Sequence, residues 1–393
     1  MAKRFGWLPL LGPLIAAVSV TAQPSISTRT IDVSETAGIR RTEYPVTARV
    51  ELPRGALRDA SNARLKVTDE VAAQFTAETS WDDGSVRALN VDFNASLGPG
   101  ERRRYILEFG QDVKQAVAGR GLSVTEEADG IQVGSIRFGR SGAPLVVSAN
   151  YVKMNFIGMG RNGISVTDTA GTQHDLSSAQ DLKRDVVKRG PLKVVLRYTG
   201  RLPLDQGSAP FVVTMEMPNS KSWLKMSAVV QDPGKRIRSV AFDSPLAFSA
   251  LPLTYDFGTE NGTYGAFRNA TDTAILTQTV NQKGPAGWNV RTGTQGGQLN
   301  DYESSANGRA HGSGHLLDAR GAVAFGFADF AREQGTYRIA LSGSGQASFS
   351  FEPSRPAAEH RLTVYQHFVS TPVPIGAATS PTAMLNPLKV ELK

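Results

Sequence analysis

Short stretches in which apolar and polar side chains alternate recur along most of this chain. Leu224, Met226 and Ala228 alternate with Lys225 and Ser227, which is the period of a strand with one buried face. The stretches are separated by Gly, Pro, Asn and Asp, the residues that form turns. The 39 Gly and 21 Pro of the chain also fit a fold with many turns. The alternation therefore predicts an all-β protein.

Other segments show the same strand pattern. They are residues 105–109, 131–138, 192–198, 322–327, 347–351 and 362–368. Helical candidates are few and short, and we expect them only at residues 68–76 and 113–117.

The first 22 residues have the pattern of a secretory signal peptide. Lys3 and Arg4 precede an apolar stretch over residues 5–20, and small residues follow up to Ala22. At about 16 residues, this stretch is shorter than the roughly 20 that a membrane-spanning helix needs. We therefore expect cleavage after Ala22 and no membrane span in the mature protein.

The absence of cysteine narrows both chemistry and location. It excludes disulfides, thiolate metal sites and iron–sulfur clusters. An exported protein without disulfides is typical of bacteria, so we expect a periplasmic or secreted protein. The net charge of +7 mildly favours acidic partners, but the basic residues are scattered and we expect no nucleic-acid partner. Phosphate-binding and dinucleotide motifs are missing, so no cofactor is expected. The oligomeric state is left open.

The chain divides between residues 110 and 122, where one predicted strand ends and a new series of predicted strands begins. Residues 28–110 have the size of a small barrel, and residues 122–393 are long enough for a large β-sandwich. Within the second unit, residues 281–314 are rich in Gly, Asn, Gln and Ser, and they are too many and too polar for an ordinary hairpin loop. Such a stretch is either a functional loop on a β-scaffold or a polar surface insertion.

Several motifs resemble the exo-rhamnogalacturonan lyase-like (YetA-like) family. The clearest is WDDGSVR at residues 81–87, which is similar to that family's W-x-D-G-S-V-[KR] turn. Weaker matches lie at residues 52–57, 97–110, 187–195 and 220–231. The resemblance implies an N-terminal RIFT barrel, a central β-sandwich and a polysaccharide lyase activity on acidic glycans. Taken by itself, the motif also predicts a turn, with Trp81 covering one end of the barrel or stacking on a sugar.

Two departures separate this chain from the family pattern. Lys188 and Arg189 stand where the family has an acidic residue before Gly190-Pro191. The sequence also ends at Lys393, where the helical toroid of the family would begin. If the toroid contributes to catalysis, the lyase activity would be lost, and the resemblance therefore supplies no catalytic residues.

The candidate site is predicted from the chemical groups that uronate β-elimination requires. That reaction needs a cation beside the carboxylate, a base for the α-proton and an acid for the leaving oxygen. Residues close together in sequence supply all three types. The predicted catalytic residues are Tyr302, Arg309, His311 and His315, and the predicted substrate-binding residues are Trp288, Arg291, Tyr365 and His367.

Other chemistries use different residues. A glycoside hydrolase would need two carboxylates about 5 to 10 Å apart. Candidates for such a pair are Asp301, Glu303, Asp318 and Asp329. On an extended strand, His311 and His315 would lie about 13 Å apart, so no metal site is expected there. Three hypotheses follow: a secreted enzyme acting on acidic polysaccharide, a non-catalytic glycan-binding protein, and a structural envelope protein.

Overall fold

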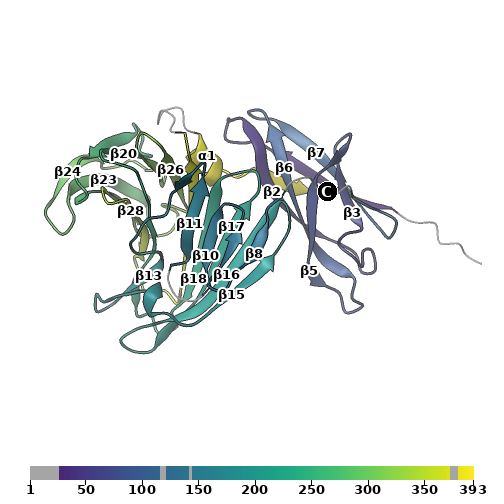
Figure 1. Cartoon of the computed structure of the whole chain (residues 1–393), viewed down its shortest axis with the longest axis horizontal. Coiled ribbons are helices and arrows are strands. Elements are labelled where there is room, and N and C mark those ends of the chain that lie inside the picture. Colours follow the sequence, from purple (N-terminus) through teal and green to yellow (C-terminus); the bar gives the residue numbers. More distant parts are fainter. Residues whose placement is uncertain (1–25, 116–120, 141–143, 372–378) are drawn as a thin grey trace, which may run out of the picture.

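The computed structural model describes residues 26–115, 121–140, 144–371 and 379–393. The expected signal peptide, residues 1–22, lies outside the described residues, and the helix candidate at residues 113–117 is only partly described. Strands form two lobes joined side by side (Figure 1), and the all-β prediction is confirmed. The described ranges contain one α-helix, α1 (Ser380–Leu385), and one 3-10 turn, η1 (Leu176–Ser178). No helix in these ranges is long and apolar enough to cross a membrane.

The smaller lobe, in purple and blue in Figure 1, consists of two sheets around one core. The first sheet has the order β30 (Lys389–Leu392), β1 (Ser27–Ser34), β7 (Arg102–Phe109), β3 (Ala63–Lys66) and β4 (Glu70–Val71). The second sheet has the order β2 (Arg41–Glu51), β6 (Val86–Leu97) and β5 (Ala73–Ser80). Residues 68–76 were expected to be helical, and this prediction is wrong because their apolar side chains follow the strand period of β4 and β5.

The WDDGSVR motif forms the tight turn between β5 and β6. Gly84 has a φ of 79°, and the Asp83 carboxylate accepts the Ser85 N–H at 3.0 Å. The Trp81 indole donates to the Leu52 carbonyl at 3.1 Å, and the Arg87 guanidinium lies over its ring at 4.9 Å. Trp81 therefore anchors the turn to the neighbouring loop.

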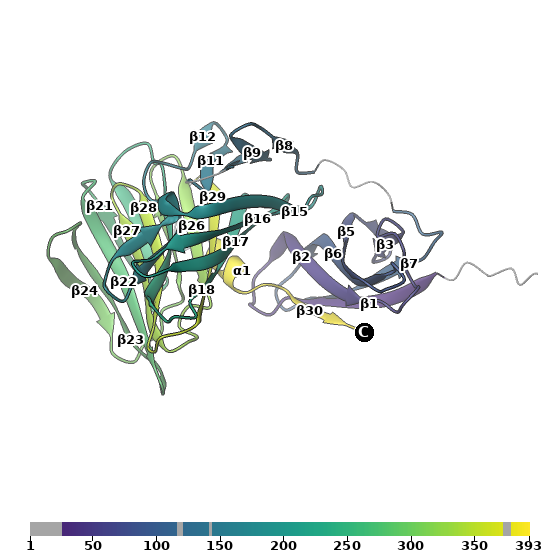
Figure 2. The same ribbon diagram turned by 90° about the horizontal axis from the view of Figure 1, so that it is seen from below.

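The larger lobe is a sandwich of two broad sheets with a small sheet at one end (Figure 2). The eight-stranded sheet has the order β14 (Gln173–Asp175), β13 (Gly163–Asp168), β19 (Ile237–Pro245), β28 (Gln346–Pro353), β27 (Gly335–Ser342), β22 (Asp272–Asn281), β23 (Gly284–Thr294) and β24 (Leu299–Ser305). The nine-stranded sheet has the order β15 (Gln180–Lys188), β16 (Lys193–Pro203), β17 (Ser208–Pro218), β18 (Trp223–Gln231), β29 (Glu359–Val369), β26 (Ala322–Ala328), β25 (Ser313–Leu317), β20 (Leu253–Phe257) and β21 (Thr263–Phe267). The small sheet has the order β12 (Met154–Asn155), β11 (Val146–Tyr151), β10 (Ile136–Gly139), β9 (Gly130–Val133) and β8 (Val124–Glu126).

The alternation in the sequence decides which side chains fill the sandwich core. Leu224 and Met226 of β18 and Phe325 of β26 are buried against the opposite sheet, which contributes Phe349 of β28. Residues 281–314 were considered too long for a hairpin, but most of them form the β23–β24 hairpin, in which Trp288 pairs with Ser305. Many of their side chains are exposed or half-buried, since β24 is the edge strand of the sheet and β23 lies next to it.

The C-terminal segment ties the two lobes together. After β29 the chain forms α1 between the lobes, and β30 then pairs antiparallel with β1 in the small lobe (Figure 2). Arg41 of β2 donates to the carbonyls of Ala383 and Asn386 at 3.1 and 2.6 Å. The same guanidinium pairs with Glu35, and both side chains are almost fully buried. The prediction from sequence assigned residues 122–393 to one unit and did not indicate that the chain returns to the small lobe at its C-terminal end.

Candidate functional site

Two cavities lie on the outer face of the nine-stranded sheet, on either side of α1. We name them the helix-side cavity, of about 440 Å³, and the interlobe cavity, of about 220 Å³. A single row of cross-strand neighbours runs beneath both of them: Ser313, Gly326, Tyr365, Lys225 and Glu216. Antiparallel partners point to the same face of a sheet, so these positions share the outer surface.

Leu385 of α1 covers the middle of this row. A Cβ added to Gly326 would lie 3.0 Å from its Cδ2 atom, so glycine lets the helix sit directly on β26. Ser313 and Leu385 line the helix-side cavity, whereas Tyr365, Lys225 and Glu216 line the interlobe cavity. The helix therefore separates two sites that share one strand surface.

The helix-side cavity contains two of the predicted catalytic residues, Arg309 and His311. Its other polar lining comes from Ser313, Asp329, Arg332, Thr382 and Asn386. Asp329 and Arg332 form an ion pair with each other. Within the described ranges, neither the Arg309 guanidinium nor the His311 imidazole makes a hydrogen bond or an ion pair. The cavity thus has an available cation and an available imidazole.

The backbone beneath these two side chains is held firmly, although the side chains are exposed. The Arg309 N–H donates to the Glu260 carboxylate at 3.0 Å, and the His311 N–H donates to the Gly258 carbonyl at 2.7 Å. Gly312 has a φ of 68°, and a Cβ there would lie 2.3 Å from Phe330 Cβ. Glycine at this position lets the loop lie flat against Phe330 and present both side chains on one side.

His315 lies on the same strand face as Ser313, but it is buried beside the cavity and does not line it. Its Nδ1 atom lies 3.0 Å from both carboxylate oxygens of Asp256 on the adjacent strand β20. Its Nε2 atom is buried without a partner among the described residues. The structure therefore places His315 in a buried pair with Asp256, away from Arg309.

Tyr365 and His367 lie on one face of β29, as their spacing predicts. His367 Nδ1 lies 2.8 Å from the Ser380 hydroxyl at the start of α1. Burial, with a smaller effect from the charges of Lys221 and His315, lowers the pKa of His367 to about 4. Tyr365 instead faces the interlobe cavity, where burial raises its pKa. Tyr365 therefore lines the interlobe cavity, whereas His367 contacts the start of α1.

The remaining predicted residues lie on the other sheet. Tyr302 is exposed on β24, and its hydroxyl donates to the Tyr264 carbonyl at 3.0 Å. Trp288 is only 4% exposed and packs into the sandwich core. Arg291 pairs with Asp301 at 3.4 Å on the sheet edge. None of these three residues lines either cavity, because β23 and β24 belong to the eight-stranded sheet.

The interlobe cavity was not foreseen from the sequence. Glu216 lies between Lys193 and Lys225, with N–O distances of 2.6 and 2.8 Å. Burial opposes ionisation of this carboxyl, but the two lysine charges lower its pKa to about 2. Trp223, only 5% exposed, and Tyr44 pack edge to face at the same place, so this tryptophan is part of the contact between the lobes.

An ion pair crosses between the lobes near this cavity. Lys188 donates to Asp92 of β6 at 2.7 Å, and both side chains are largely buried. Lys188 lies on β15 of the larger lobe and Asp92 on β6 of the smaller one, so this ion pair joins the lobes.

Comparisons with known proteins were made on both sequence and fold. No family model matches this chain, and no curated protein matches it. Its fold is similar to that of a protein in the glycosyl hydrolase family 38 from Enterococcus faecalis, with a TM-score of 0.62 at 10% identity, covering 93% of this chain and 47% of that one. It is also similar to an alpha-mannosidase from Enterococcus faecalis V583, with a TM-score of 0.59 at 10% identity, covering 93% and 46%. The chain thus spans about half the length of these proteins, and the likeness shows a shared fold.

Proposed function

We propose that the protein binds an acidic polysaccharide in the helix-side cavity and cleaves it by β-elimination. The observation that carries this proposal is that Arg309 and His311 line one cavity with no partner of their own within the described residues. A guanidinium is suited to bind a uronate carboxylate through two parallel hydrogen bonds. An imidazole titrates near neutral pH and can accept a proton there.

The proposed step uses these two residues in turn. Arg309 binds the carboxylate and stabilises the negative charge that develops when the adjacent C–H bond breaks. His311 takes that proton, the electron pair forms the C=C bond, and the C–O bond to the leaving sugar breaks. The imidazolium of His311 then returns a proton to the leaving oxygen, so that charge and protons balance.

Two further observations support a carbohydrate substrate. The fold is shared with a family 38 glycosyl hydrolase and an alpha-mannosidase. The sequence motifs resemble a family of lyases that act on acidic glycans. Neither observation names the sugar or the linkage, and the net charge of +7 agrees with an acidic ligand.

The second candidate is binding without cleavage. It is favoured because Tyr302 and His315, the other two predicted catalytic residues, do not line the cavity. In that case Arg309 would still bind the carboxylate, and His311 would contribute a hydrogen bond only. The two candidates share a site and differ in product formation.

The test incubates the purified mature protein with a panel of acidic and neutral polysaccharides. Ultraviolet absorbance of unsaturated uronate and the number of reducing ends are followed in parallel. The proposal predicts a rise in absorbance with acidic glycans only, and a loss of at least 100-fold, on the order expected for a lost acid–base group, in His311→Gln. Arg309→Ala should weaken binding about 10-fold or more.

Arg355→Ala is the matched control, because it removes an exposed arginine that lines neither cavity. Reducing ends without absorbance would indicate hydrolysis and would overturn the elimination step. Binding without either product would establish the second candidate. No binding to any acidic glycan would overturn both.

We also propose that the mature protein acts outside the cytoplasm, on the basis of the N-terminal pattern of residues 1–22. Expression of the full chain in a bacterial host, followed by fractionation and N-terminal sequencing, tests this. A mature protein beginning at Gln23 in the periplasm or medium is expected. An unprocessed protein in the cytoplasm would contradict it.

A further inference from the structure

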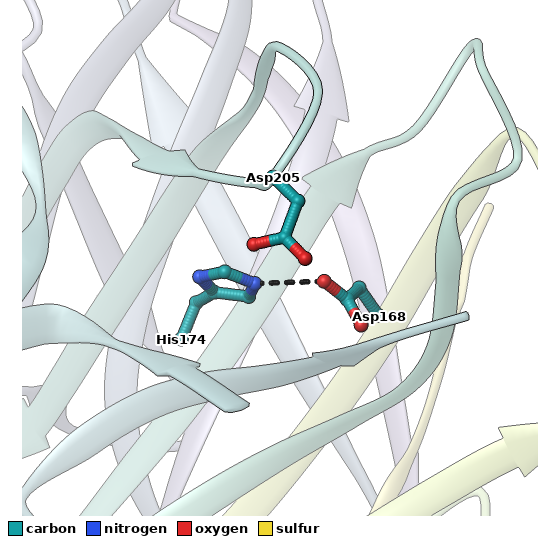
Figure 3. Close-up of side chains that lie close together, drawn as sticks. All are labelled: Asp168, His174 and Asp205. Carbon is teal, nitrogen blue, oxygen red and sulfur yellow. Dashed lines mark hydrogen bonds and ion pairs between the residues drawn. The ribbon is translucent and has the colours of Figure 1, made fainter. Parts of the chain in front are cut away.

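A second cluster of chemically active side chains lies far from α1, where two hairpins of the sandwich meet. Asp168 is at the end of β13, His174 is on β14, and Asp205 is in the turn between β16 and β17 (Figure 3). The first two belong to the eight-stranded sheet, and the third connects strands of the nine-stranded sheet. Figure 3 shows the two carboxylates on either side of one edge of the imidazole ring.

The donor atoms are close enough to share an ion. One ligand atom from each residue lies within 4.8 Å of the other two, and His174 Nε2 lies 3.0 Å from Asp168 Oδ2. Two ligands of a tetrahedral metal, each about 2.1 Å from it, are about 3.4 Å apart. The His174–Asp168 distance of 3.0 Å is slightly shorter, so a small shift of this pair and movement of Asp205 towards it would bring all three ligands into range.

The surrounding backbone fixes two of the three groups. The Thr172 N–H donates to Asp168 Oδ1 at 2.9 Å, which leaves Oδ2 directed at His174. His174 is held on β14 opposite Val166 of β13. Such hydrogen bonds to the second carboxylate oxygen orient ligands in metal sites.

The charge of the cluster is not balanced by any lysine or arginine. Within the described ranges, neither Asp168 nor Asp205 forms an ion pair with a Lys or Arg side chain. In the part of the chain that the structure describes, the only side-chain hydrogen bond that Asp205 accepts is from the Thr172 hydroxyl, at 3.4 Å. Two carboxylates held this close repel each other unless a cation lies between them. A bound divalent cation would supply that charge.

We propose that Asp168, His174 and Asp205 bind one divalent transition-metal ion, with Zn²⁺ as the best match. A nitrogen ligand with two carboxylates suits Zn²⁺ or Mn²⁺, whereas Ca²⁺ prefers sites built from oxygen alone. The ion would connect the β13–β14 hairpin to the β16–β17 turn and so join the two sheets at this end of the sandwich. Water would complete the coordination.

The test uses the full mature protein without an affinity tag, after treatment with EDTA. Titration with ZnCl₂ followed by calorimetry should give one site per chain, and saturating Zn²⁺ should raise the unfolding temperature by about 2 to 4 °C. MnCl₂ should bind more weakly and CaCl₂ should give no shift. Asp205→Asn, at an exposed position, should fold normally and lose Zn²⁺ affinity at least 10-fold, as should His174→Gln.

Asp112→Asn is the control, because it removes an exposed carboxylate outside the cluster. Zn²⁺ binding that is unchanged in both cluster variants would overturn the proposal. So would an unfolding temperature that is the same with and without saturating Zn²⁺. The readouts are metal binding and unfolding temperature, and they do not depend on glycan activity.

Discussion

The two cavities beside α1 are built on one row of strand positions, yet their charges are arranged in opposite ways. In the interlobe cavity, Glu216 lies between Lys193 and Lys225, and every one of these charges has a partner. In the helix-side cavity, the Arg309 guanidinium and the His311 imidazole have none within the described residues. Charges that are paired within one sheet are already neutralised, whereas unpartnered exposed groups remain available to a ligand.

The difference assigns a different task to each side of the helix. The interlobe side joins the two lobes through the Lys188–Asp92 ion pair and the aromatic contact of Trp223 with Tyr44. The helix-side cavity contributes little to the joint and carries the chemistry of the proposed function. If this comparison holds, substitutions on the two sides should separate into those that change stability and those that change binding.

The largest effect is expected for Arg41→Ala, because Arg41 fixes the end of α1 that divides the two cavities. The substitution leaves Glu35 buried without its cation and removes the hydrogen bonds to Ala383 and Asn386. We expect a loss of about 3 to 5 kcal/mol in the free energy of unfolding, measured by guanidinium denaturation. Arg54→Ala, which breaks an exposed pair with Asp82, should cost less than about 1 kcal/mol. Equal losses in the two variants would contradict the anchoring role.

Glu216→Gln should have the next largest effect and tests the interlobe side directly. The folded pKa of about 2 lies below the ordinary value of 4.5, so the ionised carboxylate stabilises the folded protein by up to about 3 kcal/mol above pH 4.5. This contribution is lost as the pH falls from 4.5 towards 2. The variant should therefore be less stable than the parent at pH 7, and the difference should shrink in acid.

A matched control for Glu216 is Glu78→Gln, which breaks an exposed pair with Arg49. Its unfolding curve should change little at either pH. A Glu216→Gln variant as stable at pH 7 as the parent would show that the ion pairs of Glu216 with Lys193 and Lys225 do not stabilise the folded protein.

His367→Gln tests the boundary between the two sides. The folded pKa of His367, about 4, lies below its ordinary value of 6.5, so protonation is easier in the unfolded chain. Stability is therefore unaffected above pH 6.5 and falls as the pH drops from 6.5 to 4, by about 2 kcal/mol at pH 5. The variant should lose this pH dependence while Glu216 keeps its own at lower pH. Parallel unfolding curves for parent and variant between pH 7 and 5 would contradict this.

The strands could be predicted from sequence because each depends on a local pattern. Leu224, Met226 and Ala228 are buried and Lys225 is not, as the alternation requires. The turn at residues 81–87 could also be recognised, since Asp83 and Gly84 form it with local contacts. The hairpin of β23 and β24 was missed because its polar composition obscured the strand period.

The pairing of strands, and with it the site, could not be predicted in the same way. Arg309 and His311 are close in sequence and do line one cavity, but Tyr302 lies on the opposite sheet because β24 and β25 belong to different sheets. Asp92 and Lys188 are far apart in the chain and meet only when the lobes pack. Glu216 was not among the predicted site residues, because nothing in the local sequence indicates that Lys193 and Lys225 lie beside it.

The smallest effect on stability is expected for Arg309→Ala, and this small effect would distinguish the helix-side cavity from the interlobe cavity. The hydrogen bond from Arg309 to Glu260 uses the backbone N–H, so it remains after the side chain is removed. The guanidinium has no partner to lose within the described residues, and the free energy of unfolding should change by less than about 0.5 kcal/mol. Denaturation of the variant beside Arg355→Ala measures this.

A loss above about 1 kcal/mol in Arg309→Ala alone would mean that the guanidinium stabilises the loop, and the contrast between the two cavities would fail. An Arg309→Ala variant that is as stable as the parent but has lost affinity for acidic glycan would support the contrast between the two cavities. The Arg309 guanidinium would then act in ligand binding, since it contributes nothing measurable to the free energy of unfolding.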